Sequence, residues 1–161
     1  MPLTRIDNVM QSSQEWIGDY LESLPGYSGN FVLKDSWDSE IRDPMDQNYI
    51  SIDLLETIPI QEGEVGGPLV IERYIMAFDI YAKNRRWGQN LSSLIDSKLK
   101  SGDRLFVNDY SSNPPTNSVF NCRIATSTMT HMKKVNPDPW EKHFYSVVFS
   151  VEDIHNAPGL F

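Results

Sequence analysis

The sequence feature that most constrains the fold is a long alternating segment, 69–83, near the middle of the chain. Successive side chains of a β-strand point to opposite faces, so a period of two predicts a strand here. One face carries large apolar side chains, namely Tyr74, Met76, Phe78 and Ile80. The opposite face carries Ile75 and Ala77, so both faces of the predicted strand are partly apolar.

An amphipathic helix is predicted over 5–24, before the first strand. Its apolar stripe consists of Ile6, Val9, Met10, Trp16, Ile17, Tyr20, Leu21 and Leu24. Thr4 can cap the first turn, with Asp7 in a capping-box-like position, and the Pro25-Gly26 pair ends the helix. At about 1.5 Å per residue such a helix is about 30 Å long, enough to lie across a whole sheet.

A second amphipathic helix is predicted over 86–100, directly after the long strand. Its apolar stripe consists of Trp87, Leu91, Leu94, Ile95 and Leu99. Lys98 and Lys100 suit the negative end of the helix dipole, and Gly102 is well placed to terminate the helix.

The remaining strands complete the order α-β-β-β-α-β-β-β. They are predicted at 29–34, 49–58, 104–110, 119–132 and 143–154, with Ile50, Ile52 and Leu54 on one face of the second. We expect one α+β domain over 1–161 with an irregular tail from about 155, built on a mostly antiparallel sheet with both helices on one face. The second face, with Ile75, Ala77 and Phe120, would prefer a protein partner to water.

Length and composition are those of an ordinary soluble globular domain. The chain has 161 residues, of which 40% are hydrophobic and 22% are charged. No apolar run approaches the roughly 20 residues that cross a bilayer, and residues 1–7 lack the features of a secretion signal. The single cysteine, Cys122, rules out an internal disulfide, so we expect synthesis in a reducing cytoplasm.

The formal net charge of −8 argues against specific DNA binding over most of the surface. Affinity for nucleic acid comes largely from Lys and Arg side chains that displace counterions from the phosphates. An acidic surface does suit a channel through which DNA slides without sticking. It suits plain solubility equally well.

Several short motifs point toward chemistry, but each lacks an essential part. Residues 137–142 contain the letters of a PD-(D/E)xK nuclease, yet the acids lie in one proline-broken loop and no residue separates Glu141 from Lys142. The acidic loop 35–48 lacks the spacing and central glycine of an EF-hand, and the three histidines are too widely spaced for a zinc site. The glycines of 63–67 fit no phosphate-binding pattern, and Cys122 reads as a buried core residue. We therefore predict no catalytic residue, metal ligand or cofactor, and no enzymatic activity.

Interface residues are predicted in exposure-prone segments and in the one concentrated basic cluster. That cluster is Lys83, Arg85 and Arg86 beside Trp87, for which burial in the core is the default expectation. Arginine and tryptophan are enriched at interaction hot spots. The predicted subunit or partner contacts are Glu62, Glu64, Arg85, Arg86, Trp37 and Trp140.

The second half of the chain resembles the tail terminator, or tail-completion, proteins of bacteriophages. The resemblance is carried by the strand 72–82, a short basic turn, the helix with Leu91, Leu94, Ile95 and Leu99, a glycine-ended turn and two further strands. The N-terminal helix and the late strand 144–151 agree with it, whereas the 35–48 and 133–142 segments match no family feature.

The resemblance implies a structural virion protein at the neck-proximal end of the tail. Such proteins form a hexameric ring on the tail tube, stop its polymerisation, and join it to neck or connector proteins. Genomic DNA would pass through the lumen without specific binding. Ring contacts could come from the arm at 59–68 and from exposed strand edges, by β-augmentation.

Two alternatives stay open at this point. One is a neck or head-closure protein, or another tail-end adaptor, which shares the assembly role but binds other partners. The other is a small enzyme or ligand-binding domain of unfamiliar type, which would hold convergent titratable groups in a deep polar pocket.

Overall fold

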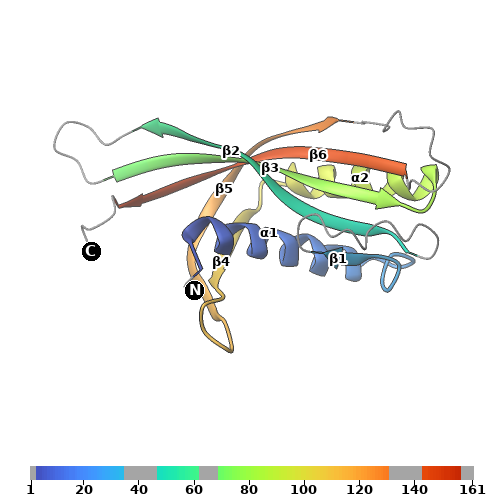
Figure 1. The fold of residues 1–161 in the computed structure, drawn as a ribbon, viewed down its shortest axis with the longest axis horizontal. Coiled ribbons are helices and arrows are strands. Elements are labelled where there is room, and N and C mark those ends of the chain that lie inside the picture. The colour runs from blue at the N-terminus through green and yellow to red at the C-terminus, as the bar shows by residue number, and fades with distance from the viewer. Residues whose placement is uncertain (1–2, 35–46, 62–68, 131–142, 157–161) are drawn as a thin grey trace.

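The computed structural model describes residues 3–34, 47–61, 69–130 and 143–156, and contains two helices and six strands (Figure 1). In chain order the elements are α1 (Arg5–Glu22), β1 (Val32–Lys34), β2 (Tyr49–Gln61), β3 (Leu69–Ala82), α2 (Arg85–Leu99), β4 (Arg104–Asp109), β5 (Thr116–Thr130) and β6 (His143–Asn156). This order confirms the predicted α-β-β-β-α-β-β-β arrangement.

All six strands form one sheet in the order β1-β2-β3-β6-β5-β4. Every neighbouring pair is antiparallel except β1 and β2, which run parallel. The alternating segment forms β3, which pairs with β2 on one side and with β6 along its whole length on the other. The predicted, largely antiparallel sheet is therefore confirmed, with β3 in its interior.

The even-numbered side chains of β3 point into the core, as the alternation predicts. Tyr74, Met76, Phe78 and Ile80 are each at most 1% exposed. They share one apolar cluster with side chains of both helices, including Ile17 of α1 and Ile95 of α2. Each large side chain buried in this way stabilises the fold by about 1.5–3 kcal/mol. Both helices thus cover the same face of the sheet, which we call the helix face.

The opposite face, here called the outer face, carries Ile75 and Ala77 as predicted, but it does not carry Phe120. Phe120 is partly buried and packs against the core cluster on the helix face. The reason is the register of β5, in which Phe120 pairs with the buried Val107 of β4 and alternates in step with the buried Cys122. The assignment of Phe120 to the second face is therefore wrong.

The first helix begins as predicted, with a capping box between Thr4 and Asp7. Two buried polar side chains of this helix form hydrogen bonds with the two edge strands of the sheet. Ser12 Oγ accepts a hydrogen bond from the backbone N–H of Asn108 in β4 (2.9 Å), and the Gln14 amide donates one to the carbonyl of Lys34 in β1 (2.8 Å). The sheet therefore curves around α1, which lies between β4 and β1 (Figure 1). The two bonding residues are only two positions apart, so these contacts place the helix between the edge strands, and its span across the whole sheet stays a prediction.

These contacts also limit the addition of further strands at the sheet edges. Besides Asn108, the backbone N–H of Tyr110 is bonded to Asn8 Oδ1 of α1 at 3.1 Å. A strand edge recruits other chains through unpaired N–H and C=O groups, and α1 has occupied some of those groups on both edge strands. Strand addition at these positions is correspondingly blocked.

The second helix begins one residue earlier than predicted because Asn84 caps it, accepting a hydrogen bond from the N–H of Trp87 (3.0 Å). It lies close on β6, and a Cβ at Gly88 would come within 2.0 Å of the Tyr145 ring. The helix is followed by Gly102 with φ +83°, as its predicted terminating role requires. In β2 Leu54 pairs with the buried Met76, so it shares the helix face with Ile50 and Ile52 as predicted, although its side chain is 37% exposed; a bulge follows it.

Candidate interaction surface

Of the six predicted contact residues, the structure describes only Arg85 and Arg86. Both are exposed in the first turn of α2. Glu62, Glu64, Trp37 and Trp140 lie outside the described residues, as do the nuclease-like motif at 137–142 and most of the acidic loop.

The neighbouring Trp87 is half-buried, in partial agreement with its expected place in the core. It packs edge-on against Tyr27, with ring centroids 5.6 Å apart, and the Lys83 ammonium lies 5.2 Å from its ring centre. This basic cluster is thus partly occupied in packing the loop after α1 against α2.

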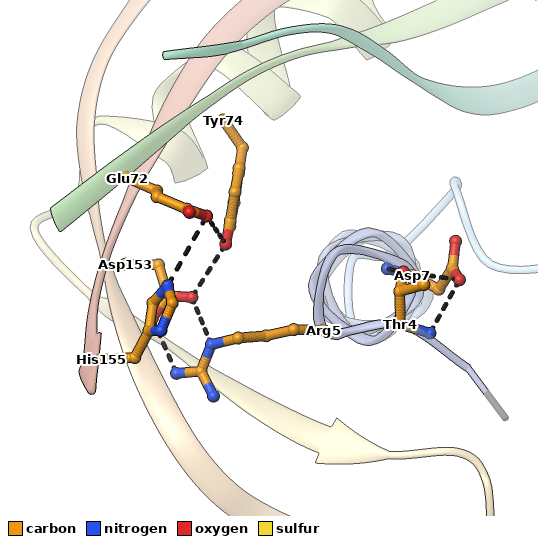
Figure 2. Close-up of polar contacts among 7 residues, drawn as sticks. All are labelled: Thr4, Arg5, Asp7, Glu72, Tyr74, Asp153 and His155. Carbon is orange, nitrogen blue, oxygen red and sulfur yellow. Dashed lines mark hydrogen bonds and ion pairs between the residues drawn. The ribbon is translucent and has the colours of Figure 1, made fainter. Parts of the chain in front are cut away.

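A partly buried polar cluster joins the start of α1 to β3 and β6 (Figure 2). Arg5 holds Asp153 with two hydrogen bonds, from Nη2 to Oδ1 (2.8 Å) and from Nε to Oδ2 (2.5 Å), and the Asp153 side chain is fully buried. The hydroxyl of Tyr74 lies 3.0 Å from Asp153 Oδ2 and 2.9 Å from Glu72 Oε2. His155 Nε2 lies 3.6 Å from the same Glu72 oxygen.

The chemistry of this cluster is that of a structural clamp. Burial, and then the charge of Asp153, raise the pKa of Tyr74, so its hydroxyl remains a hydrogen-bond donor. Burial, and then Asp153, raise the pKa of Cys122 to about 12, which keeps the sulfur a thiol as its expected core role requires. The guanidinium of Arg5 also lies 3.5 Å above the Phe120 ring. These groups fix α1 to three strands and present no activated nucleophile.

A second polar group lies on the outer face, where Ser51, Asp79 and Ser146 are neighbours across β2, β3 and β6. Ser146 Oγ donates to Asp79 Oδ1 at 2.9 Å. Burial, and then a hydrogen bond with Asp53, raise the pKa of Asp79 to about 7. The two carboxyl groups of Asp79 and Asp53 therefore share a proton near neutrality. Within the described ranges, no three Asp, Glu, His or Cys side chains are grouped so that they could hold a metal ion.

One exposed part of the outer face is the corner formed by β4, β5 and β6 with the adjoining end of β3. One row of residues runs across these strands in register: Arg104, Arg123, Glu152 and Arg73. Three large apolar side chains lie to one side of this row, with Phe106 and Ile154 each 59% exposed and Val119 46% exposed. We call this set (Arg73, Arg104, Arg123, Phe106, Val119 and Ile154) the arginine corner.

A cavity of about 530 Å³ opens in the arginine corner. Its lining residues are Arg104, Phe120, Asn121, Arg123, Glu152 and Ile154. Arg73 neutralises Glu152 through an ion pair of 2.7 Å, and Arg104 Nε donates to the neutral amide of Asn121. Among the residues that the structure describes, no carboxylate pairs with Arg104 or Arg123. Like charges directly opposite each other destabilise a strand pair, so an anionic group from outside would relieve the repulsion.

The arginine corner combines arginine with exposed apolar side chains. Arginine and aromatic residues are enriched at protein interfaces, so this composition is typical of surfaces that contact other proteins. Sequence reasoning missed this site because its members lie far apart in the chain and meet only through the strand register. The only sequence signal was the expectation of an uncovered second face.

Comparison with known proteins adds no further assignment. No protein-family model matches the chain, and no curated protein matches it either. No helix in the described part of the chain is long and apolar enough to cross a membrane.

Proposed function

We propose that this protein is a structural virion-assembly protein, a tail terminator of a bacteriophage. It forms a ring at the head-proximal end of the tail tube, stops tube polymerisation and joins the tail to the neck. The observation that carries the proposal is the arrangement of elements: an N-terminal helix before the sheet, a long interior strand, and a second helix directly after that strand. This is the arrangement on which the resemblance to tail terminators rests.

The polar cluster around Asp153 and the arginine corner both support a role in assembly over a role in catalysis. The cluster around Asp153 engages Arg5, Tyr74 and Cys122 in holding α1 to the sheet. The accessible polar site, in contrast, is the arginine corner, where charged and apolar groups lie together on the surface. A surface of this composition favours contacts with other proteins.

The partners follow from the position of the ring. One side would contact tail tube protein, and the other would contact neck or connector proteins. Genomic DNA would pass through the lumen, where the acidic charge of the chain disfavours retention of the phosphate backbone. Copies of the chain would contact one another head to tail, because such contacts close into rings.

Deletion of the gene from a phage that carries it tests the proposal. We expect overlong tails without heads in electron micrographs, and restoration of normal particles when the wild-type protein is supplied from a plasmid. Tails of normal length together with heads that leak DNA would instead identify a neck or head-closure protein. Normal, infectious particles would contradict any role in assembly.

A second experiment tests the activity directly. Purified tail tube protein is allowed to polymerise with increasing amounts of this protein, and tube lengths are measured by electron microscopy. We expect shorter tubes and a ring of extra density at one tube end. Unchanged tube lengths, with no bound protein on the tubes, would refute capping.

A further inference from the structure

The surface of α1 carries an acidic stripe. Because the sheet curves around the helix, only a narrow arc of α1 is exposed, and four of its five residues are acidic. The exposed residues, which we call the acidic stripe, are Asp7, Gln11, Glu15, Asp19 and Glu22. They recur at intervals of three or four residues, so they lie on one face of the helix.

The carboxylates of the acidic stripe have only neutral partners within the described ranges. Tyr110 Oη donates to Glu15 Oε2 at 2.6 Å, and Ser28 Oγ donates to Glu22 Oε2 at 2.6 Å. Asp7 is bonded by Thr4 in the capping box. No basic side chain of the described residues forms an ion pair with any of the four carboxylates.

Two members of the stripe, Asp19 and Glu22, lie where negative charge is unfavourable for the helix itself. The last turn of α1 contains no basic residue. Asp19 and Glu22 therefore face the negative end of the helix dipole, where cations are preferred. Helix stability does not account for their charge, which is therefore available for an intermolecular contact.

The acidic stripe and the arginine corner are complementary and lie on opposite sides of the sheet. Leu105 and Cys122 point into the core beneath the helices, so their neighbours Arg104 and Arg123 point to the outer face. The stripe lies on the solvent side of α1, which covers the helix face. One copy thus presents unneutralised positive charge in one direction and unneutralised negative charge in the other. Two different patches that fit each other define a head-to-tail contact.

We propose that the acidic stripe of one copy docks on the arginine corner of the next copy. The carboxylates approach the opposed guanidiniums of Arg104 and Arg123, and the exposed apolar side chains of the corner are covered by the neighbouring subunit. The contact is the subunit interface of the ring, so it rests on the proposed function. It assigns this interface to Arg123 and Asp19 instead of to the exposed Arg86 of α2.

Charge exchange at Arg123 and Asp19 tests this contact. Both side chains are exposed and form no ion pair with the described residues, so the variants are expected to fold. The full chain is followed by sedimentation velocity from dilute solution up to its solubility limit. We expect Arg123→Glu and Asp19→Lys each to weaken self-association about tenfold or more, because each places like charges across the contact. The combined R123E/D19K variant restores the attraction with reversed polarity and recovers most of the affinity.

Two control variants carry the same charge changes elsewhere. Arg86→Glu changes α2, and Glu56→Lys changes the exposed part of β2; both should leave self-association within about twofold of wild type. Added salt should weaken the wild-type association, because screening acts on exposed charges.

Several results would overturn the proposal. One is a wild-type protein that sediments as a monomer at every concentration. Others are a combined variant that stays as weak as the singles, or control variants that weaken association equally. Binding of a short DNA duplex that depends on Arg123, with self-association unchanged by Arg123→Glu, would assign the corner to nucleic acid instead. Failure of the proposed function is seen separately, since it appears as tails of normal length in the deletion phage.

Discussion

Replacement of Arg5 by alanine should destabilise the protein strongly, because it leaves the fully buried Asp153 without a cation. Removing one partner of a buried ion pair costs about 3–5 kcal/mol. The side chain of Arg5 is itself 32% exposed, which favours the lower end of that range, although its stacking on Phe120 is lost as well. We expect a loss of about 3 kcal/mol, which for a chain of this size lowers Tm by about 6–12 °C.

Urea denaturation followed by tryptophan fluorescence measures this loss, and Arg85→Ala is the matched control. Arg85 is also the first residue of a helix, but it is exposed and its side chain forms no ion pair with the described residues. Its replacement should change the free energy of unfolding by less than about 0.5 kcal/mol. A double-mutant cycle with Asp153→Asn should give a coupling energy above about 1.5 kcal/mol. If the two single losses add within about 0.5 kcal/mol, the clamp does not exist as described.

Three further outcomes are expected. Gly88→Ala should lose about 1–3 kcal/mol in spite of better helix propensity, because the new Cβ meets the Tyr145 ring; an unchanged urea midpoint would show that the ring moves aside freely. The folded-state pKa of Asp79 is about 7, above its ordinary value of 3.8, so the stabilisation from its proton is lost as pH rises from 3.8 through about 7. The free energy of unfolding of wild type, minus that of Asp79→Asn, should therefore fall over this pH range. Parallel pH profiles of the two proteins would contradict this expectation. Cys122 is 1% exposed with a raised pKa, so a thiol reagent should modify it only at the rate of unfolding; rapid modification of the native protein would be incompatible with its burial.

The sequence was sufficient to predict the elements whose side chains follow one strict period. The alternation around Phe78 defined β3, and the helical spacing around Ile17 and Ile95 defined the two helices, because a buried face enforces its period on the sequence. The predicted length of the first helix, in contrast, did not indicate that its Ser12 and Gln14 side chains would bond to both edge strands.

What sequence periodicity could not supply was strand register. Phe120 sits in a segment where both alternating sets contain apolar residues, and only its pairing with Val107 decides which face it occupies. The arginine corner depends on register even more. Arg104, Arg123 and Arg73 come from three strands, and nothing local in the sequence indicates that they share one row. Arg85 and Arg86 were predicted as contact residues because they are adjacent in the chain and form a visible basic cluster.

The curvature of the sheet around α1 links the architecture to the kind of assembly that the protein can form. By bonding to Asn108 and Lys34, the helix occupies backbone groups on both edge strands, so the sheet cannot extend into a neighbour at those positions. The same curvature narrows the exposed surface of α1 to its acidic stripe and leaves the arginine corner uncovered on the other side of the sheet. At those positions contacts between copies would rely on side chains, whose charges are screened by salt and can be reversed by single substitutions. A ring built in this way should be separable into folded monomers by salt, whereas a ring built by strand addition would resist salt.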